Sequence, residues 1–146
     1  QETGVDGLII PDLPYEEKNE LLSNCRKYDV DLISLIAPTS DDRIQMIARE
    51  GMGYIYVVSS LGVTGIRSNI TTDIGAIVKR IREVTDNPVA VGFGIATPEQ
   101  AKKMAGLSDG AIVGSAIVKI VEQYGKDAAG PVKKYVEEMV AAVRKA

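Results

Sequence analysis

Five times along the chain, a short apolar run that ends in a turn is followed by a segment whose apolar residues have helical spacing. The apolar runs lie at residues 7–10, 31–37, 54–59, 88–91 and 110–113. A continuous apolar run of this length is typical of a strand covered on both faces. Strands that alternate strictly with helices form a parallel sheet with right-handed crossovers. The sequence therefore predicts an α/β fold of five consecutive βα units, which fits either an open doubly wound sheet or a section of a (β/α)8 barrel.

The segments between these runs carry signals for helix starts. Thr97, Pro98 and Gln100 match an N-cap, a first-turn proline and the partner residue of a capping box. Ser40 can cap a helix whose first turn holds Asp41, where the helix dipole favours negative charge. We expect helices at about 14–28, 40–51, 71–84, 116–124 and 131–145, and one that begins at residue 97.

Composition narrows the possible functions. The 146 residues suit a single domain, 1–146, and a net charge of −3 without a basic stripe gives no support for nucleic-acid binding. The apolar runs are too short to cross a membrane. The absence of histidine excludes histidine-based triads and histidine metal sites. The one cysteine, Cys25, excludes an internal disulfide and is expected to be an apolar helix residue, which fits a cytoplasmic location.

Three of the five strand ends are rich in glycine: 62–65, 92–94 and 114–115. In open parallel sheets and in barrels alike, ligands bind at the carboxyl ends of the strands. Ser115 adds a hydroxyl and can cap a short helix whose N-terminus attracts anions. A barrel often holds phosphate between the loops after strands seven and eight and a short extra helix. We therefore predict a phosphate site and a (β/α)8 barrel of which the five strands are numbers four to eight; the alternative is that these are turn glycines only.

Particular segments resemble a known family. They are Pro-Asp-Leu-Pro at 11–14, Leu-Ile-Ala-Pro-Thr-Ser at 35–40, the segment 56–65 ending in Gly-Val-Thr-Gly, Ala-Val-Gly-Phe-Gly-Ile at 90–95, and Val-Gly-Ser-Ala-Ile-Val at 113–118. In order and spacing they resemble the tryptophan synthase alpha chain family along essentially the whole chain. The resemblance implies a partial TIM barrel, with the N-terminal three units absent from this chain.

The same resemblance implies an activity and a partner. The family cleaves indole-3-glycerol phosphate to indole and glyceraldehyde 3-phosphate, an aldol-type step of L-tryptophan biosynthesis. The alpha chain uses no cofactor and no metal. It passes indole to a beta chain that carries pyridoxal phosphate, in an α2β2 complex.

The resemblance also implies roles for individual residues. The phosphate would be bound by Gly65, Phe93, Gly94, Gly114 and Ser115. The rest of the substrate would meet Tyr56, the apolar walls Ile9, Ile36 and Ile112, and Thr64 of a mobile loop. Asp12 and Pro14 would lie on the side that meets the beta chain. Simpler explanations stay open: Tyr56 could face the helices, the isoleucines and Phe93 could be ordinary packing, and Asp12 could cap a helix.

The two carboxylates of the family reaction are a glutamate and an aspartate of strand two. Because strand two precedes strand four in the barrel, both are expected upstream of Gln1. This chain therefore contains no catalytic residue of the family, and Asp12, which follows a strand directly, is not assigned as a substitute. We expect the chain alone to keep a phosphate site and to lack lyase activity. Another sugar-phosphate barrel enzyme, or a non-catalytic phosphate-binding or partner-activating module, remains an alternative.

Overall fold

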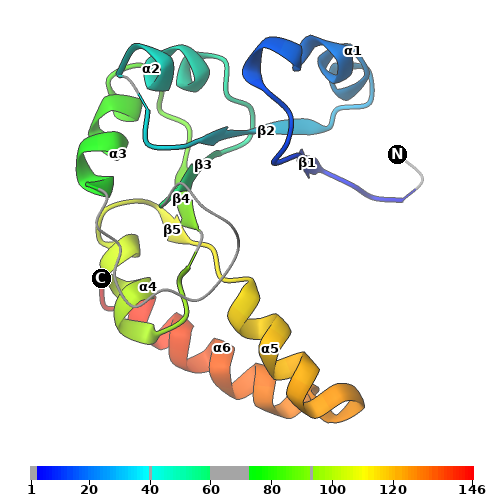
Figure 1. Ribbon diagram of the computed structural model, residues 1–146, viewed down its shortest axis with the longest axis vertical. Helices are drawn as coiled ribbons and strands as arrows, with labels where there is room; N and C mark the ends of the chain where they lie inside the picture. Colours follow the sequence, from blue (N-terminus) through cyan, green and yellow to red (C-terminus); the bar gives the residue numbers. More distant parts are fainter. Residues whose placement is uncertain (1–2, 40, 60–72, 93) are drawn as a thin grey trace.

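The computed structural model describes residues 3–39, 41–59, 73–92 and 94–146, and its strands form one parallel sheet (Figure 1). The strands are β1 Gly7–Ile9, β2 Asp31–Ile36, β3 Ile55–Val58, β4 Val89–Gly92 and β5 Gly110–Ala111. Their order in the sheet is β1-β2-β3-β4-β5, so each strand pairs with the next along the chain. The predicted series of five βα units is confirmed.

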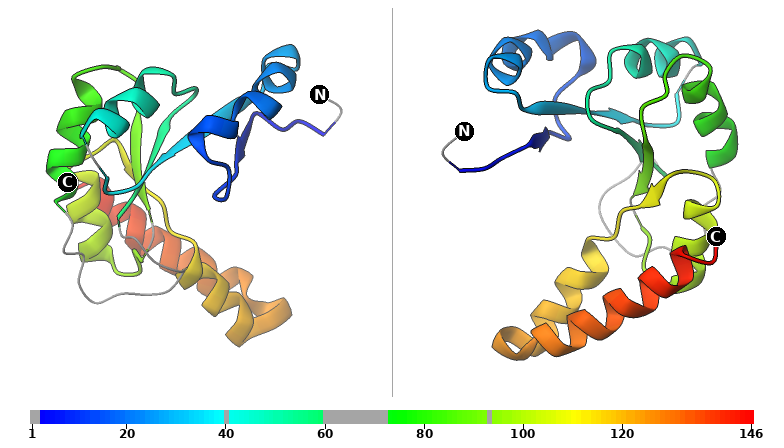
Figure 2. Two further views of the ribbon diagram at one scale, coloured as in Figure 1. Left: turned by 45° about the horizontal axis from the view of Figure 1, so that its top comes forward. Right: turned by 180° about the vertical axis from the view of Figure 1, so that it is seen from behind.

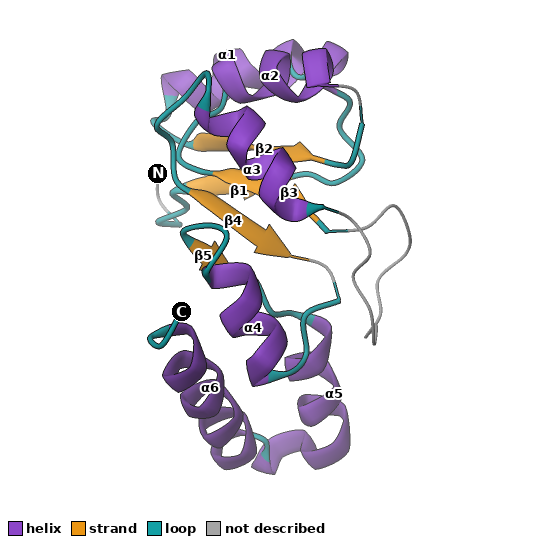
Figure 3. Cartoon of the chain, turned by 90° about the vertical axis from the view of Figure 1, so that its left-hand side faces the viewer, coloured by secondary structure: helices purple, strands orange, loops and turns teal. Residues whose placement is uncertain are grey.

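Helices follow the strands in the expected order. They are the short 3-10 helix η1 Tyr15–Glu17, α1 Asn19–Lys27, α2 Asp41–Arg49, α3 Ile74–Arg82, α4 Pro98–Ala105, α5 Ser115–Tyr124, the 3-10 helix η2 Gly125–Asp127 and α6 Ala129–Val143. Figure 2 shows that the sheet curves and that α1 to α4 cover its outer, convex side. Helices α5 and α6 run side by side away from the sheet, and α6 also packs on α4 (Figure 3). None of the described helices is long and apolar enough to cross a bilayer.

Two helix starts show why the chain turns where it does. Thr97 Oγ1 accepts a hydrogen bond from the Gln100 N–H at 3.3 Å, and Gln100 Oε1 accepts from the Thr97 N–H at 3.1 Å. This is the predicted capping box of α4. Asp73 caps α3 by accepting from the Ala76 N–H at 3.0 Å. The predicted cap at Ser40 lies outside the described residues.

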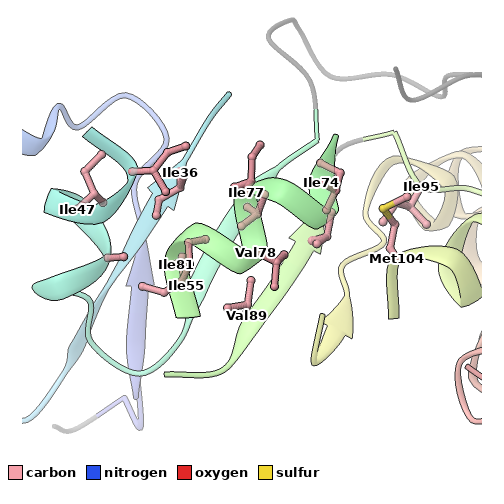
Figure 4. Close-up of a cluster of buried hydrophobic side chains, with 14 of the residues drawn as sticks. Ile36, Ile47, Ile55, Ile74, Ile77, Val78, Ile81, Val89, Ile95 and Met104 are labelled. Atoms are coloured by element: carbon pink, nitrogen blue, oxygen red, sulfur yellow. The ribbon is translucent and has the colours of Figure 1, made fainter. Parts of the chain in front are cut away.

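The main core lies between the outer face of the sheet and α2 to α4. Residues paired in register share a face, so Ile36, Val57 and Val91 project together toward the helices. Figure 4 shows Ile77, Val78 and Ile81 of α3 packed over this layer. The buried cluster comprises Ile36, Ile44, Ile47, Ala48, Ile55, Val57, Ile74, Ile77, Val78, Ile81, Val89, Val91, Ile95, Ala101, Met104 and Met139. Each large side chain in it contributes roughly 1.5–3 kcal/mol by leaving water, which fixes the strands and thereby the loops at their ends.

Candidate phosphate and substrate site

The carboxyl ends of β4 and β5 lie side by side. Val91 pairs with Ala111, and the Ile112 N–H donates to the Val91 carbonyl at 2.8 Å. Gly94 and Gly114 therefore follow two neighbouring strands. Gly94 has a φ of +82°, in the left-handed region that glycine adopts without strain. The structure thus brings together the two glycine-bearing strand ends that the sequence singled out.

The N-terminus of α5 forms the second side of the candidate phosphate site. The Gly114 carbonyl accepts from the N–H groups of Ile117 at 2.9 Å and Val118 at 3.1 Å, which closes the first turn. The first N–H groups of a helix have no partner within the helix and carry partial positive charge. No described atom lies within 4 Å of the position that a Cβ on Gly114 would take. An anion can therefore approach the backbone here.

The capping role predicted for Ser115 is wrong. Ser115 is the first residue of α5 and Gly114 is the N-cap, with no side-chain capping bond. A glycine has no side-chain acceptor, so it offers no side-chain cap to the N–H groups of Ser115 and Ala116, which precede the bonded N–H groups of Ile117 and Val118. Ser115 itself is partly buried at this helix start, where its hydroxyl can add a donor for an anion.

Tyr56 lies on the inner face of the sheet, opposite its neighbours Ile55 and Val57. It pairs with Leu35 of β2 and Ala90 of β4, and its ring reaches the backbone of Gly92. Only 8% of the residue is exposed. Burial, and then the nearby Tyr54, raise the pKa of the Tyr56 hydroxyl, so the phenol is neutral at physiological pH. The alternative that Tyr56 faces the helices is excluded.

The three isoleucines do not share one face. Ile9 pairs with Ile33, and Ile33 lies two residues before Leu35 on the same strand. Ile9 and Ile33 therefore lie on the inner face of the sheet with Leu35, and Ile9 is 48% exposed. Ile112 continues β5 on the side of Gly110 and is partly buried. Ile36 instead projects outward into the helix-covered core beside Ile47 (Figure 4). This differs from the expected wall position because strand alternation turns Ile36 away from Leu35 and Tyr56.

The other residues expected at the substrate site or at the partner surface either lie in the loop after β1 or fall outside the described residues. Asp12 and Pro14 lie in the loop between β1 and η1. Among the described residues no side chain forms a capping bond at the start of η1 or α1, so Asp12 caps neither helix. Thr64, Gly65 and Phe93 lie outside the described residues.

The acid–base groups of the family reaction are expected outside this site. The family's glutamate and aspartate are expected upstream of Gln1, and Gln1 itself lies outside the described residues. Asp12, which was not assigned as their substitute, is exposed in its loop. Within the described part of the chain, no group of Cys, Asp or Glu is arranged to hold a metal ion. The position of the acid–base groups stays a prediction.

Two contacts of the loop after β4 were missed from the sequence. The Tyr135 hydroxyl of α6 donates to the Ala96 carbonyl at 2.8 Å. Gln100 Oε1 accepts from the Ala96 N–H at 2.9 Å, in addition to its bond within the capping box. The sequence placed Tyr135 in the apolar stripe of the last helix, and that pattern carries no signal for where the hydroxyl points.

The sequence of this chain matches a known protein family along almost its whole length. The family model described as tryptophan synthase alpha chain matches residues 1–145. The chain belongs to the tryptophan synthase alpha chain family. Its parallel sheet, with helices on the outer side, matches about half of the barrel in the solved structures of tryptophan synthase alpha chains.

Curated tryptophan synthase alpha chains are similar in sequence. The alpha chain of Lacticaseibacillus casei is 48% identical over 139 residues, which are 95% of this chain and 52% of that protein. The alpha chain of Thermoanaerobacter sp. (strain X514) is 51% identical over 127 residues, 86% of this chain and 48% of that protein. The chain thus spans about half the length of these relatives.

Solved tryptophan synthase structures are similar in fold. The alpha subunit from Campylobacter jejuni has a TM-score of 0.80 and 35% identity, covering 94% of this chain and 55% of that one. A chain of the tryptophan synthase α2β2 complex from Pyrococcus furiosus has a TM-score of 0.81 and 34% identity, covering 96% of this chain and 57% of that one.

Proposed function

We propose that this chain forms the phosphate-binding part of a tryptophan synthase alpha subunit, the lyase that cleaves indole-3-glycerol phosphate to indole and glyceraldehyde 3-phosphate. The observation that carries the proposal is the pair of adjacent strand ends, β4 and β5, with Gly94 after one and the open Gly114–Ser115 start of α5 after the other. Backbone N–H groups and a helix N-terminus suit the three terminal oxygens of a phosphate ester.

The inner face of the sheet supports an aromatic substrate. Tyr56 presents a neutral ring next to the end of β4, and Ile9 and Ile112 add apolar surface on the same face. An indole ring needs such apolar walls, because its burial is favourable only against apolar neighbours. Thr64, Gly65 and Phe93 are retained as candidate contacts from the family resemblance.

The acid–base groups of the reaction belong to another part of the family's barrel. Carbon–carbon cleavage requires protonation of the indole ring and deprotonation of a glycerol hydroxyl. The glutamate and aspartate of the family's second strand are proposed to lie outside these 146 residues, as the family resemblance implies. The chain by itself is therefore proposed to bind the phosphate ester without cleaving it, and to need neither a metal nor a cofactor.

The proposed partner is a tryptophan synthase beta chain. A similar solved structure, from Pyrococcus furiosus, is an α2β2 complex whose two kinds of subunit activate each other. Asp12 and Pro14, beyond the end of β1, are proposed to face that partner, which carries the pyridoxal phosphate. A reducing compartment, the cytoplasm, suits a chain whose single cysteine is buried and free.

Isothermal titration of the 146-residue chain tests the proposal. We expect indole-propanol phosphate, a non-cleavable analogue, to bind more tightly than inorganic phosphate. Equal, weak binding of both would favour a general phosphate-binding module instead. Binding of neither would overturn the proposed phosphate site.

A turnover assay tests the proposal that this chain binds the phosphate ester without cleaving it. The chain incubated with indole-3-glycerol phosphate should release no glyceraldehyde 3-phosphate above the rate without protein. Cleavage at a rate proportional to the protein concentration would show that the acid–base groups lie within these residues after all.

A further inference from the structure

Tyr135 joins two parts of the protein that the sequence separates by 39 residues. It lies in α6, and its hydroxyl donates to the Ala96 carbonyl in the loop after β4. Burial raises the pKa of this hydroxyl, so it remains a protonated donor at neutral pH. Its acceptor lies two residues after Gly94, on the strand end to which the phosphate site was assigned above.

The loop that receives this bond is held by three contacts, two with α4 and one with α6. The Ile95 side chain is 3% exposed and packs beside Met104 of α4 (Figure 4). The Ala96 N–H is taken by Gln100 Oε1 at 2.9 Å, and the Ala96 carbonyl by Tyr135 at 2.8 Å. Both polar groups of one residue are thus held by side chains of two different helices. Gly94 has a left-handed φ and no side chain of its own, so its backbone is positioned through its neighbours.

Tyr135 also links the two sides of the site. Helix α5, whose start holds Gly114 and Ser115, continues through η2 into α6. The hydroxyl of Tyr135 therefore ties the helix pair α5–α6 to the opposite side of the site, the loop after β4. The apolar part of the ring packs against the core cluster, which fixes where the hydroxyl points.

We propose that Tyr135 is a positioning residue for the phosphate site: its hydrogen bond to the Ala96 carbonyl sets the loop after β4 against the start of α5. Phosphate recognition by backbone N–H groups requires donors fixed at about 2.7–3.2 Å from the oxygens. A loop that moves by a fraction of an ångström loses part of that binding. The inference rests on the proposed function, because it assigns Tyr135 to the phosphate half of that site.

Tyr135→Phe removes the hydroxyl and keeps the ring in the core. Tyr124→Phe is the matched control, since Tyr124 lies at the far end of α5 and is 46% exposed. We expect Tyr135→Phe to weaken binding of indole-propanol phosphate by about three- to tenfold, the loss that follows from one neutral hydrogen bond. Binding of phosphate-free indole-propanol should be unchanged, and Tyr124→Phe should bind both ligands as the unchanged chain does.

Amide hydrogen exchange gives a reading that does not depend on any ligand. In Tyr135→Phe, the Ala96 and Thr97 amides should exchange faster than in the unchanged chain, whereas Tyr124→Phe should leave them as they are. A purely structural role would lower the melting temperature and weaken both ligands equally, which would overturn the inference. Equal phosphate-ester binding or unchanged exchange in Tyr135→Phe would also overturn it.

The two proposals fail in different ways. If the unchanged chain binds no phosphate compound, the proposed function falls, and with it the claim that this loop is held for an anion. If the unchanged chain binds the phosphate ester and Tyr135→Phe binds it equally well, only the role of Tyr135 falls.

Discussion

The ring of Tyr56 lies so close to the backbone of Gly92 that no side chain fits at position 92. A Cβ built there would come within 2.7 Å of Tyr56 Cζ and 2.8 Å of Cε2. Gly92 pairs with Val58, two residues after Tyr56 on the neighbouring strand, so the ring leans along the sheet toward the end of β4. Space rather than backbone conformation requires the glycine.

Gly92→Ala is therefore expected to force the Tyr56 ring out of its place. Overpacking of a buried site costs typically 1–3 kcal/mol, and we expect a loss of about that size in urea unfolding. The strain should largely disappear when Tyr56→Ala is added, so the two changes should be coupled by about 1 kcal/mol or more. Gly110→Ala is the matched control, because no atom of the described residues lies within 4 Å of its Cβ position. Equal unfolding midpoints for Gly92→Ala and Gly110→Ala would contradict the close contact.

Thr97 gives a second prediction, on the helix that carries Gln100. Thr97→Ala removes the acceptor for the Gln100 N–H, and the loss of an N-cap costs roughly 0.5–2 kcal/mol. Thr97→Ser keeps a hydroxyl at the same place and should unfold within a few tenths of a kcal/mol of the unchanged chain. Thermal unfolding followed by circular dichroism measures both. A stability of Thr97→Ala equal to that of Thr97→Ser would show that the capping bond contributes nothing.

The strand order and the start of α4 could be predicted from the sequence because both depend on local patterns. Continuous apolar runs identified the strands, and Thr97, Pro98 and Gln100 identified the capping box. Strand ends were less certain: β5 holds only Gly110–Ala111, although the apolar run continues to Val113. The run fixes which residues are apolar, whereas the neighbouring strand decides how many of them pair.

Side-chain direction was the part that the sequence could not supply. Ile36 was expected beside the substrate, but its pairing with Val57 turns it into the outer core, and one step of register decides the face. Ser115 was expected to cap α5, but the helix begins at Ser115 itself. The Tyr135 hydroxyl finds a carbonyl in a loop far along the chain, and no helical periodicity encodes such a contact.

Gly114 gives a prediction on the anion itself. Gly114→Asp places a carboxylate at the start of α5, where no described atom lies within 4 Å of the Cβ position and an aspartate is also a good N-cap. The helix should be as stable as before or more so, while binding of indole-propanol phosphate should fall by about tenfold or more through like-charge repulsion and competition for the same N–H groups. Isothermal titration measures the affinity, and thermal unfolding the stability.

Gly130→Asp is the control for that change. Gly130 lies in the first turn of α6, and within the described part of the chain no atom lies within 4 Å of its Cβ position either. The added charge is the same, but it lies at another helix start, so phosphate binding should be retained. A similar loss of affinity in both variants would indicate a general charge effect and not a site at Gly114.

Glu50 gives the prediction on pH. Its carboxylate accepts hydrogen bonds from Lys18 and, at 2.8 Å, from the Tyr15 hydroxyl, and these two bonds lower the pKa of Glu50 in the folded state. The contacts join η1 to the C-terminal end of α2. A depressed pKa in the folded state contributes stability above the unfolded value, about 4.3 for glutamate. That contribution is lost as the pH falls through about 4 and below.

Glu50→Gln should therefore flatten the decline in stability between about pH 5 and pH 3, measured as urea midpoints at half-unit steps. At pH 7 the variant should be slightly less stable than the unchanged chain, by a small amount because the carboxylate is exposed to solvent. The two should converge once the pH falls below the depressed pKa of Glu50 in the folded state, because the carboxyl is then protonated in both states. Glu122→Gln, on the exposed side of α5, serves as control and should keep the full decline. A parallel decline in Glu50→Gln and in the unchanged chain would mean that the bonds from Lys18 and Tyr15 do not persist in solution.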